Sequence, residues 1–148
     1  MLTQSSLLQF SRTAADVYKA SAHHIMGCEW LTVNKEGKGA VMSTGPGSAP
    51  SPPDFLLMSL GACTGYGVKF LLDKQAKKFT KLDVDVEGEW TNEPERRFGN
   101  IKLLVKTDAD IEESKLKAIV KMVEDKMCPV GLTLKYPPKI VAEVKIAK

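Results

Sequence analysis

The sequence predicts one domain of the α+β class, with antiparallel sheets and two long central helices. Residues 81–107 alternate between apolar and polar side chains, as do residues 139–147, and this period of two is typical of strands. Two other segments, 51–78 and 110–134, carry helical patterns instead. Because strands and helices do not alternate regularly, an α+β fold is favoured. A chain of 148 residues is long enough to bury one such core.

Residues 1–39 are expected to form short N-terminal strands. Two or three apolar segments stand here between polar turns, although their alternation is imperfect. His23 and His24 lie between two of these segments without further ligand residues at metal spacing, so surface or interface positions are expected. Residues 34–50 contain four glycines and two prolines and are predicted to be a loop, either a flap over a site or a plain connector.

The segment 51–78 is predicted to form the central helix. Ser51 and Asp54 have the spacing of a capping box, which marks its beginning. Lys69 is the one charge between residues 55 and 72, so the helix is apolar nearly all round and is expected to be buried. Three glycines lower its helix propensity and suggest the close approach of another backbone or a ligand: Gly61, Gly65 and Gly67. The same glycines and the short length argue against a membrane span.

The remaining elements follow in order along the chain. Residues 81–107 are predicted to form an antiparallel hairpin with one solvated face. The second helical segment, 110–134, opens with the capping-box spacing of Asp110 and Glu113 and has one apolar face. Residues 139–147 are predicted to form the last strand.

The composition excludes several classes of function. A net charge of +3, with lysines spread along the chain, gives little support to nucleic-acid binding. The first ten residues lack the basic and apolar regions of a signal peptide, so a cytoplasmic location is expected, with free thiols. The three cysteines are far apart and form no C-x-x-C pair, so neither a metal site nor another cofactor is predicted.

Two cysteines stand at special places in this pattern. Cys63 lies among the glycines of the central helix, and Cys128 lies at a helix end beside Pro129. An activated thiol with a second cysteine in reach can be oxidised to a sulfenic acid and then form a disulfide. Cys63 is too far into its helix for the dipole alone to activate it, so a cation from elsewhere would be needed. Buried, inert thiols are the alternative, and Cys28 is expected to be structural.

The motifs around these cysteines resemble the OsmC/Ohr family, named after osmotically inducible protein C and the organic hydroperoxide resistance protein. The resemblance lies in Pro50-Ser51-Pro52-Pro53-Asp54 running into Leu56-Leu57-Met58-Ser59-Leu60-Gly61-Ala62-Cys63-Thr64, with Cys128-Pro129-Val130 downstream. It covers residues 40–148 and joins two separated motifs.

The resemblance implies a fold and an activity. Two chains would intertwine as a homodimer, with the cysteine-bearing helices at its centre and the active sites at the interface. Cys63 would attack an organic hydroperoxide, and Cys128 would resolve the sulfenic acid as a disulfide. An external dithiol, in this family often a lipoyl-bearing protein, would reduce that disulfide, and no metal or haem would be required.

Two positions depart from the peroxidases of that family. Their glutamate ten residues before the cysteine is replaced here by Pro53, and the nearest acid is Asp54, a candidate orienting group. Their activating arginine has one candidate before Cys63, which is Arg12. Without such a cation the pKa of a thiol rises. The alternative hypothesis is therefore a dimer of the same fold that binds a small apolar ligand or senses redox state without being an enzyme.

Overall fold

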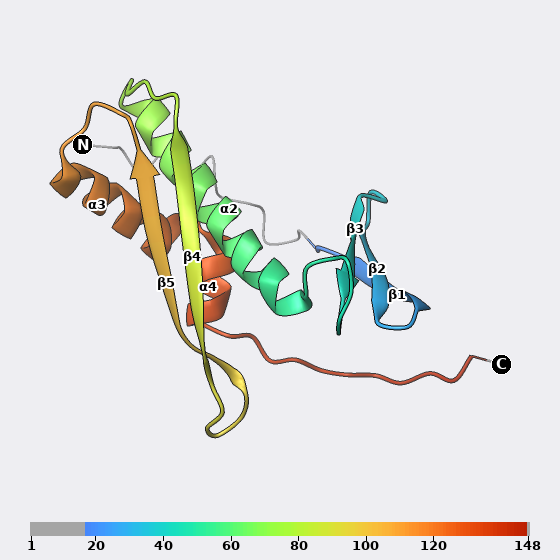
Figure 1. Ribbon diagram of the computed structural model, residues 1–148. Coiled ribbons are helices and arrows are strands. Elements are labelled where there is room, and N and C mark those ends of the chain that lie inside the picture. Colours follow the sequence, from blue (N-terminus) through green and yellow to red (C-terminus); the bar gives the residue numbers. More distant parts are fainter. Residues whose placement is uncertain (1–16, 148) are drawn as a thin grey trace. The chain divides into compact units, whose positions relative to one another are not determined.

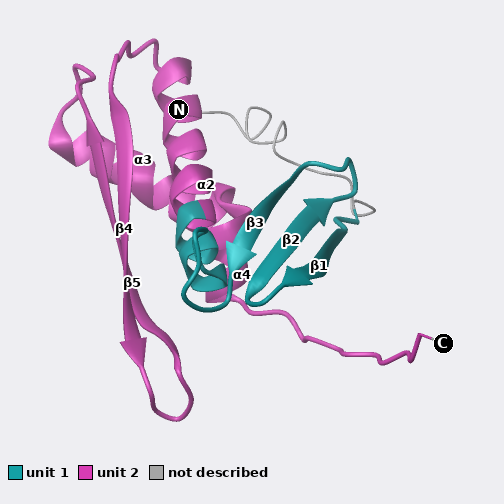
Figure 2. Ribbon diagram, turned by 45° about the vertical axis from the view of Figure 1, so that its right-hand side comes forward, with its two compact units in different colours: residues 1–58 teal, residues 59–148 magenta. Residues whose placement is uncertain are grey.

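Figure 1 shows the computed structural model of the chain, which describes residues 17–147. Arg12 and the strand expected before residue 17 lie outside the described residues. The chain divides into two compact units, residues 1–58 and 59–148 (Figure 2).

The first unit contains a three-stranded antiparallel sheet in the order β1-β2-β3. Its strands are β1 (Ala20–Met26), β2 (Glu29–Asn34) and β3 (Gly39–Ser43). The prediction of a loop over residues 34–50 was therefore wrong in its middle, where β3 forms. The reason lies in the turn that Asn34 begins: its Oδ1 accepts from the N–H groups of Glu36 and Lys38, both at 3.0 Å, and Gly37 adopts a φ of 77°. This tight turn returns the chain as a hairpin.

A buried serine fastens the loop that follows β3. Ser43 is 1% exposed, donates to Oε1 of Glu29 at 2.7 Å and accepts from the N–H of Ala49 at 3.3 Å. The backbone N–H of Ser43 also donates to the carbonyl of Pro50 at 3.2 Å. These hydrogen bonds hold the loop before the central helix at both ends.

The central helix α2 (Pro52–Lys74) begins as predicted. The hydroxyl of Ser51 donates to Asp54 at 2.6 Å and accepts from the Asp54 N–H at 3.4 Å, which completes the capping box. The helix ends four residues before the predicted limit, and Ala76 then takes a φ of 53°. By length and composition α2 could cross a membrane, but the core helix of a soluble protein passes the same test, and 39% of its most apolar stretch is buried.

The glycines of α2 allow neighbouring side chains to pack close to its backbone. A Cβ added at Gly67 would lie 2.6 Å from Cγ1 of Val123, and one at Gly61 would lie 3.0 Å from Cγ2 of Val86. At Gly65 the nearest atom, Cγ2 of Val84, would be 3.4 Å away. Close approach therefore explains the glycines, and the approaching groups are side chains of this fold.

The second unit contains the predicted hairpin, formed by β4 (Leu82–Thr91) and β5 (Arg97–Thr107). The two strands are antiparallel, and their register pairs Val84 with Val105 and Val86 with Leu103. At the far end of the hairpin Trp90 stacks on Phe98, with ring centroids 4.3 Å apart, and the guanidinium of Arg96 lies 4.9 Å from the Trp90 ring.

The second helical segment is divided into three parts. They are α3 (Glu113–Met122), the π-helical turn η2 (Val123–Met127) and α4 (Pro129–Lys135). The predicted capping box at Asp110 does not form, because α3 starts after Glu112, which makes no side-chain cap bond. The core of this unit joins these helices to α2: Leu60, Val68, Leu71, Leu72, Ile119, Val123, Met127 and Cys128 are buried.

The C-terminal segment differs from its prediction. Residues 139–147 form no strand in the described structure, and Ile140, Val144 and Ile146 are 88–90% exposed. Alternating apolar residues form a strand only when a neighbouring strand takes up their backbone hydrogen bonds. None of residues 17–147 supplies that neighbour to this segment.

Candidate functional site

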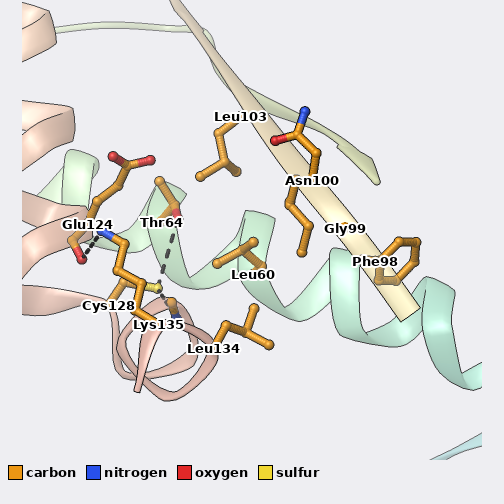
Figure 3. Close-up of a pocket in the computed structure, with 12 residues that line it drawn as sticks. Leu60, Thr64, Phe98, Gly99, Asn100, Leu103, Glu124, Cys128, Leu134 and Lys135 are labelled. Atoms are coloured by element: carbon orange, nitrogen blue, oxygen red, sulfur yellow. Dashed lines mark hydrogen bonds between the residues drawn. The ribbon is translucent and has the colours of Figure 1, made fainter. Parts of the chain in front are cut away.

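A pocket of about 280 Å³ opens in the second unit beside Cys128 (Figure 3). Its walls come from α2, β5 and the η2–α4 region, and they are apolar over much of their surface: Leu60, Ile101, Leu103 and Leu134 line it. A mostly apolar pocket with a few polar groups is the usual form of a small-molecule site.

The local sequence fixes the position of Cys128 within this wall. The π-helical turn ends at Met127, and Pro129 begins α4, so Cys128 takes an extended conformation between them and caps α4. Its N–H donates to the carbonyl of Val123 at 2.9 Å, and its Sγ accepts from the N–H of Gly131 at 3.2 Å. The side chain is buried from bulk solvent, with 1% of the residue exposed.

Thr64 connects the motif around Cys63 to the motif around Cys128. Its hydroxyl donates to the Sγ of Cys128 at 3.9 Å, and both residues are buried. Thr64 directly follows Cys63 in α2, so this bond ties the first cysteine motif to the second across 64 residues of chain. In Figure 3 a dashed line marks this bond between Thr64 on α2 and the yellow sulfur of Cys128.

Two charged residues, Glu124 and Lys135, also line the pocket. The Nζ of Lys135 donates to the carbonyl of Glu124 at 3.2 Å and to Oδ1 of Asp125 at 3.3 Å. Asp125 also accepts from Lys121 at 2.9 Å, and the hydrogen bonds from Lys121 and Lys135 lower the pKa of its carboxyl group. The ammonium group of Lys135 is therefore held near the pocket by an acid and a main-chain carbonyl.

The three cysteines lie in different surroundings in the structure. All three cysteines are free thiols. Cys128 lines the pocket, whereas Cys63 is half-buried on α2 and is not among the residues that line it. Cys28 donates to the carbonyl of Pro46 at 3.5 Å, a contact that suits its expected structural role.

Asp54 is occupied by the cap of α2. Its carboxylate accepts from the hydroxyl and the N–H of Ser51 at 2.6 and 2.9 Å, and these bonds lower its pKa. Nine residues of α-helix correspond to about 13 Å of rise and to opposite sides of the helix, which separates Asp54 from Cys63 within α2. Its role as an orienting acid stays a prediction.

No histidine or arginine among residues 17–147 lines the pocket. Arg96 and Arg97, the arginines of residues 17–147, belong to the tip of the β4–β5 hairpin. His23 and His24 are exposed, and His24 contacts the Gly27 carbonyl at 3.0 Å. Within the described part of the chain, no group of three metal-ligating side chains occurs.

Three of the residues that line the pocket were not predicted from the sequence: Thr64, Glu124 and Lys135. Thr64 had one available signal, since it is a hydroxyl residue inside a helix that is otherwise apolar, and buried hydroxyl groups need partners. Glu124 and Lys135 belong to an ordinary charged helical surface in the sequence, so no pattern distinguishes them.

Comparison with known proteins identifies the family. Residues 45–143 match the family described as OsmC-like protein. The chain belongs to the OsmC-like protein family. Among curated proteins it is similar to Protein YhfA of Escherichia coli strain K12, with 27% identity over 130 residues that cover 86% of this chain and 97% of that protein.

Solved structures of OsmC-like proteins share the fold. One is an OsmC like protein from Mycoplasma pneumoniae, with a TM-score of 0.72, 18% identity and coverage of 82% of this chain and 89% of that one. Another is the organic hydroperoxide resistance protein OhrB of Bacillus subtilis, with a TM-score of 0.59, 16% identity and coverage of 84% and 94%. The predicted OsmC-like α+β fold with antiparallel sheets and helices is thus confirmed.

Proposed function

We propose that this OsmC-like protein is a thiol-dependent peroxidase that reduces organic hydroperoxides. The observation that carries the proposal is the position of the Cys128 sulfur. It lies in the wall of an apolar pocket and accepts a hydrogen bond from Thr64, the residue next to Cys63. Family membership supports it, since solved structures of the same fold include organic hydroperoxide resistance proteins.

The proposed reaction has three steps. The Cys63 thiolate attacks the O–O bond of the hydroperoxide, which leaves a sulfenic acid on Cys63, and the departing alkoxide takes up a proton as the alcohol. The Cys128 thiol then attacks the sulfenic sulfur, so that a disulfide forms and water leaves. An external dithiol, such as a lipoyl-bearing protein, reduces the disulfide by exchange and is itself oxidised.

The residues around the pocket suit this chemistry. The leucine and isoleucine walls favour the alkyl or aryl group of an organic hydroperoxide over hydrogen peroxide, which has no apolar surface to bury.

Arg12 is the candidate cation for the Cys63 thiolate and Asp54 the candidate orienting acid. No metal or other cofactor takes part in the proposed steps.

The proposal includes a homodimer as the working form, located in the cytoplasm. Apolar side chains on α2 and the C-terminal segment support it, because Met58 and Tyr66 are 54% and 60% exposed and Val144 is 89% exposed. Exposed apolar surfaces commonly mark protein–protein interfaces, and a second copy of the chain would cover these side chains.

Stopped-flow oxidation of the reduced protein tests the activity. Cumene hydroperoxide is expected to consume the thiols much faster than hydrogen peroxide does. Cys63→Ser is expected to abolish the reaction, and Cys128→Ser to leave a sulfenic acid on Cys63 that dimedone traps. Thiol loss no faster than that of free cysteine would contradict the proposal.

A second candidate is a protein of the same fold that binds a small apolar ligand or senses redox state. The apolar walls of the pocket and the buried position of Cys128 favour it. Its signature would be thermal stabilisation of the protein by cumyl alcohol, which resembles the substrate but has no O–O bond, together with no rapid thiol loss in the stopped-flow experiment.

A further inference from the structure

A bulge in β5 places the side chain of Phe98 on the half-buried face of its strand. From residue 101 to residue 107 the odd-numbered residues of β5 are half-buried and the even-numbered ones are exposed. A regular strand would therefore turn residue 98 to the exposed face. The register with β4 shifts at this point, because Trp90 pairs with Phe98 whereas Glu89 pairs with Asn100. Gly99 is left over as the extra residue of a β-bulge, and Phe98 is half-buried as a result.

Two neighbouring side chains at this end of the hairpin hold the ring of Phe98. The rings of Trp90 and Phe98 are stacked, with centroids 4.3 Å apart and planes inclined by 24°. The guanidinium carbon of Arg96 lies 4.9 Å from the centroid of the Trp90 ring, which is within the range of a cation–π contact. Trp90 covers one face of the Phe98 ring, so the other face and the edges of that ring remain to contact a ligand.

Phe98 brings an aromatic ring to the wall of the pocket. The other apolar side chains that line it are aliphatic, apart from the thiol of Cys128. Figure 3 shows Phe98 and Cys128 on opposite sides of Leu60. A ligand that reaches both Phe98 and Cys128 would therefore have its ring at one end and its polar group at the other.

We infer that Phe98 is a specificity-determining residue, through which the pocket selects ligands that carry an aryl ring. Two aromatic rings attract each other in offset-stacked or edge-to-face arrangements by more than the area they bury accounts for. A saturated ring of the same size gains from burial alone. This inference deepens the proposed function and rests on it for one consequence, which is that the hydroperoxide reduced at this site carries an aryl group. Recognition of the ring requires no O–O bond and is tested without one.

The test compares cumyl alcohol with its cyclohexyl analogue, in which the benzene ring is fully hydrogenated. Isothermal titration calorimetry with the full-length reduced protein measures the Kd of each alcohol. Cumyl alcohol is expected to bind about two- to tenfold more tightly, the factor that one aromatic pair adds to burial. Phe98→Leu keeps an apolar side chain and should remove this preference. Phe98→Tyr keeps the aromatic ring and should retain it.

A matched control and a second readout locate the bound ring. Phe79→Leu makes the same change at a residue that lines a separate cleft beside Lys77 and Thr80, and it should leave the preference unchanged. The chain has two tryptophans, so Trp30→Phe leaves Trp90 as its one tryptophan emitter. Because Trp90 stacks on Phe98, cumyl alcohol is expected to change the fluorescence of Trp90 in this variant.

Three results would overturn the inference. The first is equal affinity of the unchanged protein for the two alcohols, and the second is no binding of either alcohol up to its solubility limit. The third is a Phe98→Leu variant that loses affinity for both alcohols to the same extent, which would assign residue 98 to the shape of the pocket. No thiol reacts in these titrations, so they are separate from the test of the peroxidase. Slow thiol loss in the stopped-flow experiment would leave an aryl preference standing, and rapid thiol loss with equal affinities would remove this inference alone.

Discussion

Among the three glycines of α2, Gly67 leaves the least room for a side chain. A methyl group at this position would meet Cγ1 of the fully buried Val123 at 2.6 Å, whereas at Gly65 the nearest atom would be at an ordinary contact distance of 3.4 Å. Gly67→Ala is therefore expected to lower the free energy of unfolding by about 1–3 kcal/mol through overpacking. Gly65→Ala should be neutral or stabilising by up to about 1 kcal/mol, because alanine favours the helix.

Urea denaturation of both variants checks this prediction, with each compared to the unchanged protein. Equal destabilisation by the two substitutions would show that helix packing is not what requires glycine at residue 67. The sequence indicated that some close approach explains these glycines, but not which atoms approach. Val123 becomes a neighbour of Gly67 only through the tertiary fold, and no local pattern records that contact.

Asp108 fastens the end of the β4–β5 hairpin to the chain that enters it. Its carboxylate accepts from the Thr80 hydroxyl and from the backbone N–H groups of Lys81 and Thr80, and these bonds lower its pKa from 3.8 to about 2. A carboxyl group whose pKa is lower in the folded state stabilises the fold above the unfolded value, and this contribution is lost as the pH falls through the folded value.

Asp108→Asn is therefore expected to be less stable than the unchanged protein at pH 7, and the difference should fade as the pH falls from about 4 to about 2. Thermal unfolding across this range measures it. Asp110→Asn, which removes the same charge two residues away, serves as the control. A stability difference that stays constant down to pH 2 would mean that the charge of Asp108 is not responsible.

The elements that depend on local chemistry were predicted well from the sequence. The capping box of Ser51 and Asp54 opens α2, and the alternation of residues 81–107 corresponds to β4 and β5. Two other features were predicted wrongly. The turn after Asn34 allows β3 to form within an apparent loop, and α3 begins after Glu112 instead of at Asp110.

The candidate site was predictable only in part. Cys128 was selected for its place beside Pro129, and the structure puts it in the wall of an apolar pocket. Its contact with Thr64 joins residues far apart in the sequence, and such a pairing cannot be read from spacing. Lys135 reaches the same pocket because the π-helical turn and α4 fold back, which the sequence does not specify.

At the scale of the whole molecule, the exposed C-terminal segment provides a test of the proposed dimer. Ile140, Val144 and Ile146 share one side of an alternating pattern and are 88–90% exposed in the single chain. Val144→Asp places a charge on that side and is expected to change the particle from twice the chain mass of 16.2 kDa to a single chain at micromolar concentration.

Light scattering coupled to size-exclusion chromatography measures this change. Lys145→Asp introduces the same acid at the adjacent position, on the other side of an extended segment, and should leave the dimer intact. A single-chain mass for the unchanged protein would argue against the dimer, and a dimeric Val144→Asp variant would show that this segment does not lie in its interface.

We propose that Cys63 and Cys128 act as one redox pair. The most direct measurement adds one equivalent of cumene hydroperoxide to the reduced protein and maps its disulfides by mass spectrometry without reduction. We expect a single new disulfide that joins Cys63 to Cys128 and disappears when a dihydrolipoyl compound is added. If Cys63 and Cys128 both stay reduced, or if the new disulfide involves Cys28, the result would contradict this redox pair.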